Sequence, residues 1–161
     1  MAKFAALAAV FWIAVASAAA AQTGLSLGGL DVDPTDPVEV AADSLSVDQD
    51  TGIAKFVGNV EIIQGSLTVT AGVVEVVYSE ETGEISRLVA SEGVTFVTSQ
   101  ERAEAANAVY DIKTGLLELT GDVILVQGRN SITTSTLRVD LNAKTAVAEG
   151  RVRTVLQQGG Q

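Results

Sequence analysis

The feature that most constrains this chain is a repeat with a period of about 31 positions. Three Thr-Gly pairs separate apolar runs, and a threonine stands where a fourth pair would begin, at spacings of 31, 32 and 31 positions. A small polar residue precedes each threonine by three positions; such side chains bond the nearby backbone, and glycine accepts a positive φ. The residues are Thr51, Thr82, Thr114 and Thr145, preceded by Asp48, Ser79, Asp111 and Asn142. The repeat predicts strand-turn-strand units.

A doubled period is more regular still. Gly58-Asn59-Val60 with Gln64-Gly65 recurs as Gly121-Asp122-Val123 with Gln127-Gly128, every member 63 positions on. We interpret the motif as a hairpin or stacked-layer turn that the fold uses twice, in preference to a binding motif.

Composition and alternation both predict an all-β fold. Val, Ile and Thr make up 46 of 161 residues, and no proline follows Pro37, as expected where nearly every backbone N–H is bonded in a sheet. Apolar and polar residues alternate, as in Leu137-Arg138-Val139-Asp140-Leu141. Residues 99–108 are Glu- and Ala-rich, but the doubled register aligns them with a strand pattern, so we predict strand there too. A sandwich, a closed barrel and an elongated β-roll all fit, and the repeat favours the roll.

The first residues form a separate unit. One Lys, a 12-residue apolar run and small residues before Gln22 predict a cleavable signal peptide over residues 1–21. An uncleaved anchor is the alternative, although a membrane span needs about 20 apolar residues. Residues 22–37 contain both prolines and predict a flexible N-terminal segment, residues 38–156 the β domain, and residues 157–161 a short tail.

The residue types argue against catalysis. The chain has no His and no Cys, and its net charge is −10, which disfavours nucleic acid as a partner. Most carboxylates fall at the repeated turns, and the calcium-like fragments 31–33 and 48–52 lack the glutamate that would complete a loop. No phosphate-binding glycine loop is present. We therefore expect no enzyme activity, no catalytic residue, no cofactor and no metal.

The apolar face of the predicted strands leaves two interpretations open. Its side chains could be an ordinary sealed core, or the two β layers could remain apart and leave a trough that acyl chains fill. Terminal strands near residues 38–42 and 151–156 would expose unpaired backbone groups, which favours head-to-tail association with another chain.

One stretch of sequence resembles a known family. Residues 55–71, KFVGNVEIIQGSLTVTA, resemble the glycine-asparagine-valine core of the OstA-like proteins, and residues 120–127, TGDVILVQ, repeat its first half. The resemblance covers about residues 38–156. It implies an open, twisted, antiparallel β-jellyroll of about sixteen short strands and a non-enzymatic role in lipopolysaccharide transport in the periplasm.

The resemblance also implies partners. These are lipopolysaccharide, held by its lipid A acyl chains, the inner-membrane transporter adaptor, the outer-membrane translocon and further copies stacked head to tail. The chain ends without a basic tail, which departs from the family pattern. A membrane-anchored adaptor of the same fold is the alternative function, and a secreted β-roll enzyme acting on polysaccharide is a more distant one.

Sixteen residues are the candidate lipid-binding positions. The resemblance supplies the first five, and alternation along the strands adds the others. They are Val38, Val40, Phe96, Tyr110 and Ile112, followed by Phe56, Val60, Ile62, Leu67, Val69, Leu117, Leu119, Val123, Leu125, Leu137 and Val139.

Overall fold

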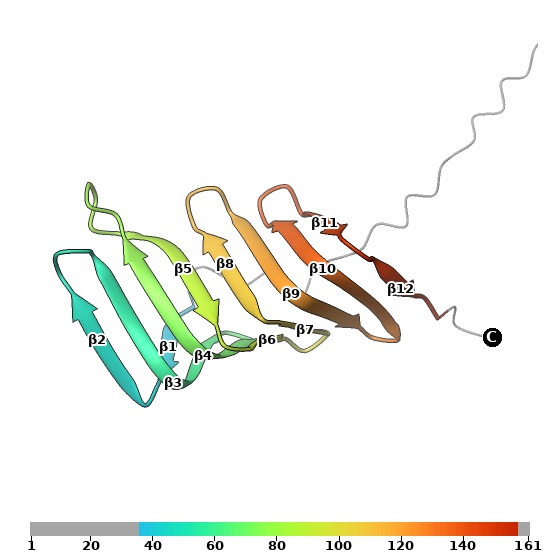
Figure 1. The fold of residues 1–161 in the computed structure, drawn as a ribbon, viewed down its shortest axis with the longest axis horizontal. Helices are drawn as coiled ribbons and strands as arrows, with labels where there is room; N and C mark the ends of the chain where they lie inside the picture. Colours follow the sequence, from blue (N-terminus) through green and yellow to red (C-terminus); the bar gives the residue numbers. More distant parts are fainter. Residues whose placement is uncertain (1–35, 158–161) are drawn as a thin grey trace, which may run out of the picture.

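The computed structural model describes residues 36–157, which form twelve antiparallel β-strands (Figure 1). The predicted signal peptide, nearly all of the segment 22–37 and the last four residues lie outside the described residues. The strands are β1 (Val38–Ala41), β2 (Ser44–Asp48), β3 (Ile53–Gln64), β4 (Leu67–Tyr78), β5 (Ile85–Ser91), β6 (Val94–Val97), β7 (Glu101–Ala105), β8 (Asn107–Asp111), β9 (Leu116–Gln127), β10 (Asn130–Asp140), β11 (Thr145–Glu149) and β12 (Arg153–Val155). Within residues 36–157, no helix is long and apolar enough to cross a membrane.

The strands build two walls that share four long members. Strands β3, β4, β9 and β10 run through both walls, whereas each short strand belongs to one. In the first wall, β2, β5, β8 and β11 complete the sheet; in the second wall, β1, β6, β7 and β12 do so. Each wall thus contains eight strand segments, in agreement with the predicted all-β roll of about sixteen. The segments stack along the long axis, from β1 and β2 at one end to β11 and β12 at the other (Figure 1).

The corner between the walls is formed by residue pairs that each contain one glycine. At each of four levels, a glycine and one adjacent residue both have a positive φ, a backbone conformation that residues other than glycine rarely adopt. The pairs are Gly58-Asn59, Glu92-Gly93, Gly121-Asp122 and Gly150-Arg151. Backbone bonds at the corner continue from layer to layer, for example from the Asp43 N–H to the Gly58 carbonyl at 2.9 Å. The motif that recurs after 63 positions is therefore a corner used twice.

The repeat also appears in the strand bounds. Strands β8 and β9 begin and end 63 positions after β2 and β3. The stretch 99–108 contributes β7 and the start of β8, so the strand prediction there is confirmed.

Three of the four predicted turns behave as expected. The Asp48 carboxylate accepts the N–H groups of Asp50 and Thr51 at 2.9 and 3.2 Å, and Asp111 accepts that of Thr114 at 2.9 Å. These backbone donors hold the pKa of both carboxyls below the usual value. Ser79 has the same role through its hydroxyl, which accepts the Thr82 N–H at 3.4 Å.

The prediction for the fourth turn was wrong. Asp140, not Asn142, accepts the turn N–H, that of Ala143, at 2.8 Å. The Asn142 amide instead donates to the Thr114 carbonyl at 3.0 Å and joins this turn to the one before it. The fourth turn begins earlier because β10 ends at Asp140, one position before the doubled register would end it.

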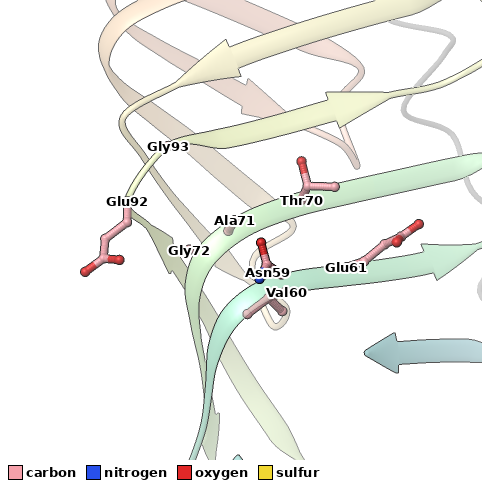
Figure 2. Close-up of a pocket in the computed structure, with 8 residues that line it drawn as sticks. All are labelled: Asn59, Val60, Glu61, Thr70, Ala71, Gly72, Glu92 and Gly93. Carbon is pink, nitrogen blue, oxygen red and sulfur yellow. The ribbon is translucent and has the colours of Figure 1, made fainter. Parts of the chain in front are cut away.

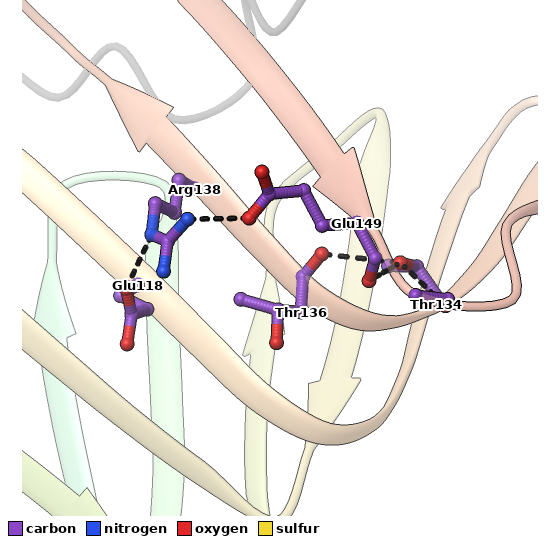
Figure 3. A network of polar contacts seen from close by, with 6 residues as sticks. Glu118, Thr134, Thr136, Arg138 and Glu149 are labelled. Atoms are coloured by element: carbon purple, nitrogen blue, oxygen red, sulfur yellow. Dashed lines mark hydrogen bonds and ion pairs between the residues drawn. The ribbon is translucent and has the colours of Figure 1, made fainter.

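Ion pairs lie on the outer face of the first wall near its C-terminal end (Figure 3). The Arg138 guanidinium donates to Glu118 at 2.6 Å and also to Glu149, which raises the Arg138 pKa, chiefly through the bond to Glu118. On the inner side, the buried Thr134 hydroxyl donates to the Glu149 carbonyl at 2.7 Å. These contacts tie β11 and the last corner to β9 and β10.

Candidate functional site

The first wall presents two continuous apolar rows to the interior. In each row, one residue from every strand stands directly opposite its neighbour, so the row runs the length of the roll. The first row is Leu45, Phe56, Val74, Ala90, Ala108, Leu119, Leu137 and Ala148. The second row is Val47, Ala54, Val76, Leu88, Tyr110, Leu117, Val139 and Ala146.

The second wall faces these rows with one of its own. Strand pairing aligns Val40, Ile62, Val69, Phe96, Ala103, Leu125, Ile132 and Thr154. Buried members of all three rows form a single hydrophobic cluster that extends from Ala54 to Val139. The inner face is therefore a long aliphatic strip shared by both walls.

The predicted lipid-binding residues gather on this face. Fifteen of the sixteen lie in strands, and twelve of these belong to the hydrophobic cluster or pack against it; Ile112 directly follows the end of β8. Their exposure divides them into three groups. Buried are Val60, Leu117, Leu119, Val123, Leu125, Leu137 and Val139; half-buried are Phe56, Ile62, Leu67, Val69, Phe96 and Tyr110; exposed are Val38, Val40 and Ile112.

Sequence reasoning missed several members of the rows. Leu45, Val47, Val74, Val76 and Leu88 have the same alternation as the predicted residues and stand beside them in register. The signal was available in the doubled register, since Leu45 precedes Ala108 and Val47 precedes Tyr110 by that interval.

The N-terminal end of the strip is open. Val40, Leu45 and Val47 are 40%, 56% and 63% exposed because, among the strands of residues 36–157, β1 and β2 have a neighbour on one side only. Each end of the roll has two edge strands, one for each wall, where the sequence predicted one. The N-terminal end consists of β1 and β2, and the C-terminal end of β12 and β11.

Polar groups border the aliphatic strip at the rim of the second wall. Glu101 on β7 is 5% exposed and faces Gln127 on β9. The Gln127 amide donates to the Glu101 carboxylate at 2.5 Å. Sequence reasoning placed Gln127 in the repeated turn motif but did not single out Glu101, since a glutamate on a strand usually lies in solvent.

A polar hollow lies at the corner, and its character differs from that of the aliphatic strip. It has a volume of about 430 Å³ and is lined mainly by polar and small residues, including Asn59, Glu61, Thr70 and Glu92 (Figure 2). The positive φ of Asn59 and Glu92 recurs at all four corners, so it belongs to the architecture of the roll. The Asn59 amide donates to Asp43 at 2.9 Å. This hollow does not offer the apolar surface that an acyl chain needs.

Comparison with known proteins agrees with this fold. Residues 39–145 match the family described as "LptA/(LptD N-terminal domain) LPS transport protein". The chain therefore belongs to this family of lipopolysaccharide-transport proteins.

Two of the similar proteins illustrate the likeness. An uncharacterised protein of Rhizobium meliloti (strain 1021) is 28% identical over 151 residues, covering 86% of this chain and 81% of the relative. The crystal structure of LptH from Pseudomonas aeruginosa, described as the LptA-homologous periplasmic component of the lipopolysaccharide-transport device, superposes with a TM-score of 0.69. It is 18% identical and covers 80% of this chain and 100% of that chain, so the likeness concerns the fold.

Proposed function

We propose that this chain is a periplasmic carrier that holds the acyl chains of lipopolysaccharide against the inner face and stacks end to end. The observation that carries the proposal is the set of three inner rows that begin at β1 and β2. Two of them stay apolar as far as β11, and the third stays apolar as far as Ile132 on β10. A sealed globular core would end in polar residues at both ends, whereas Val40, Leu45 and Val47 remain exposed at one end.

Copies of the carrier, stacked end to end, then bridge the two membranes. Its partners are the inner-membrane transporter adaptor at one end and the outer-membrane translocon at the other, with further copies between them. Export requires removal of residues 1–21, which intact-mass measurement of the periplasmic protein would detect. A product that retains Met1 would favour the membrane-anchored adaptor.

The strand pairing that joins the two halves of the roll, here called the internal seam, is a template for the stacking of copies. In the middle of the roll, β5 pairs with β8 in the first wall and β6 pairs with β7 in the second wall. Strands β8 and β7 are the counterparts of β2 and β1 in the doubled register, and β11 and β12 occupy on β10 the places that β5 and β6 occupy on β4. The same pairing between two copies would join β11 to β2 and β12 to β1.

This template fixes the register. In the seam, Val89 stands opposite Val109. The counterpart of Val89 in the last layer is Val147, because their respective partners, Glu75 and Arg138, are equivalent in the doubled register. The counterpart of Val109 is Ser46, so Val147 would face Ser46 of the next copy. By the same reasoning, Thr154 would face Val40 and extend the inner row across the junction.

Charges at the two ends favour head-to-tail contact. Strands β1 and β2 and their flanks contain Glu39, Asp43 and Asp48, whereas Arg151 and Arg153 lie at the opposite end. Head-to-head contact would place like charges together, which is unfavourable at an interface.

Photo-crosslinking tests the cargo. A benzophenone amino acid placed at Phe96 or Tyr110 should capture purified lipopolysaccharide, since both side chains lie on the inner face. The control is the same amino acid at Glu61, which is exposed and has the opposite side-chain direction to Ile62. Equal capture at all three positions would contradict the proposal.

Engineered cysteines test stacking, and the chain has no native cysteine to interfere. Mixing Val147→Cys protein with Ser46→Cys protein should give a disulfide-linked dimer, because opposed strand residues lie within disulfide reach. Ser44→Cys is the matched control, being two positions away on the same face of β2. Linkage that is as efficient with Ser44→Cys would refute the register.

A further inference from the structure

Glu101 is an acidic residue on an apolar inner face. Along β7, residues Glu101, Ala103 and Ala105 are buried, while Arg102 and Glu104 between them are more exposed. This alternation directs the Glu101 carboxylate inward, at the rim of the row that contains Phe96, Ala103 and Leu125. A charged side chain so completely buried requires partners.

Only one of its two oxygens has a partner. Oε1 accepts the Gln127 amide at 2.5 Å, whereas Oε2 is buried and has no hydrogen-bond partner within residues 36–157. A buried acceptor without a donor is unfavourable, and a ligand that brings a donor to it removes that cost. At Oε2, a ligand group that donates a hydrogen bond therefore gains more binding free energy than a hydrocarbon group does.

The architecture does not require this carboxylate. The residue 63 positions earlier is Val38, and Gln64, the counterpart of Gln127, donates its amide to the Asp36 carbonyl at 3.1 Å instead. The first half of the roll thus builds the same rim from a backbone acceptor and an aliphatic side chain. The second half carries an unsatisfied carboxylate at the equivalent place.

We propose that Glu101 determines ligand specificity by accepting a hydrogen bond from a hydroxyl or amide N–H carried close to the acyl chain of the bound amphiphile. This inference rests on the proposed function, because it needs acyl chains on the inner face. Gln127 holds the carboxylate in place through Oε1, and Oε2 remains for the ligand. Hydroxylated or amide-linked acyl chains would then bind more tightly than plain chains of the same length.

Two matched probes test the preference. The methyl esters of 3-hydroxytetradecanoic acid and tetradecanoic acid differ by one hydroxyl, and each can compete with the apolar dye N-phenyl-1-naphthylamine for the mature protein. We expect the wild type to bind the hydroxy ester about tenfold more tightly, the effect of one hydrogen bond to a charged acceptor. Glu101→Leu should abolish the preference while it keeps the affinity for the plain ester.

The outcomes separate this inference from the proposed function. Displacement by both esters with the same affinity in wild type and Glu101→Leu overturns the specificity role and leaves the carrier function standing. If neither ester displaces the bound dye, both the inference and the carrier function are overturned. If Glu101→Leu does not fold by circular dichroism, Glu101→Gln decides, since its uncharged amide must lower the preference; an unchanged tenfold ratio refutes the inference. Glu104→Gln, on the outer side of the same strand, is the control and should behave as wild type.

Discussion

The layer formed by β1 and β2 and the layer formed by β7 and β8 occupy equivalent places in the repeat, yet their inner faces differ in exposure. Val40 and Leu45 are 40% and 56% exposed, whereas their counterparts in the doubled register, Ala103 and Ala108, are each 4% exposed. Both layers pair with a long strand on one side, but only β7 and β8 have β6 and β5 on the other.

This difference shows that burial in a roll depends on the neighbouring layer more than on the strand itself. The inner layer uses alanine where the end layer uses Val40 and Leu45, so the larger aliphatic side chains stand where a neighbour is absent. Their exposed apolar surface is what a second copy would cover.

The largest expected effect compares the two copies of the corner. Gly121 has φ +83°, and a Cβ there would lie 2.5 Å from the Ala106 Cβ, which cannot move without the backbone. Gly121→Ala should lower the free energy of unfolding by about 3 kcal/mol, combining a left-handed backbone with this overlap. At Gly58 the added Cβ meets the Asp43 side chain, which can rotate away in part, so Gly58→Ala should cost about 2 kcal/mol.

Gly83→Ala is the control for these variants. Gly83 has φ +70°, but nothing lies within 4 Å of an added Cβ, so only the backbone cost of about 1 kcal/mol remains. Urea denaturation of the three variants should rank them in this order. Equal losses would show that the corner contacts add nothing to the backbone strain.

An effect of similar size distinguishes the inner layers from the end of the roll. Leu119 and Leu45 lie in the same inner row, but Leu119 is 1% exposed. Leu119→Ala should cost about 3 kcal/mol in the monomer, and Leu45→Ala less than about 1 kcal/mol. Leu45→Ala should instead weaken association, measured by sedimentation across a concentration series. A large loss of monomer stability in Leu45→Ala would contradict the open end.

Much of this architecture follows from local patterns that survive in a single sequence. Alternation supplies eleven of the predicted residues, ten of which belong to the hydrophobic cluster or pack against it, and the recurrence of Gly58-Asn59 at Gly121-Asp122 marks the corner. Glycine at a positive φ and aliphatic residues at every second position are properties of a short segment, so the sequence exposes them directly.

Other features depend on partners that are distant in the sequence, and the local sequence pattern could not predict them. The burial of Glu101 arises from its alignment with Gln127, 26 residues away, and the exposure of Val40 from the absence of a neighbouring layer. Asn142 was misassigned because its amide bonds Thr114, 28 residues earlier, and leaves the local turn to Asp140. The pattern of one turn contains none of this information.

A still smaller effect tests how far the halves are equivalent. On the outer face, Lys55 pairs with Glu75 at 3.0 Å, and their counterparts in the doubled register are Glu118 and Arg138, with the charges exchanged. Both pairs are substantially exposed, so Lys55→Glu should cost only about 0.5 kcal/mol. Adding Glu75→Lys should restore stability in chemical denaturation. No recovery in the double variant would show that the pair acts through packing and not through charge.

The smallest expected effect concerns the stability of the protein at acidic pH, and the Ser79 turn of the repeat is the control. Asp48 and Asp111 have pKa values lowered by turn N–H donors, so each carboxyl binds a proton more weakly in the folded state than in the unfolded state. Their contribution to stability is complete above the ordinary value of 3.8 and disappears as the pH falls through the lowered pKa. Asp48→Asn and Asp111→Asn should therefore flatten the acid limb of the stability curve below that pH. Ser79 accepts a turn N–H without titrating, so Ser79→Asp should raise stability at neutral pH and steepen the same limb. If Ser79→Asp leaves the acid limb unchanged in denaturation from pH 5 to pH 2, the turn N–H groups do not hold these carboxylates in their charged form.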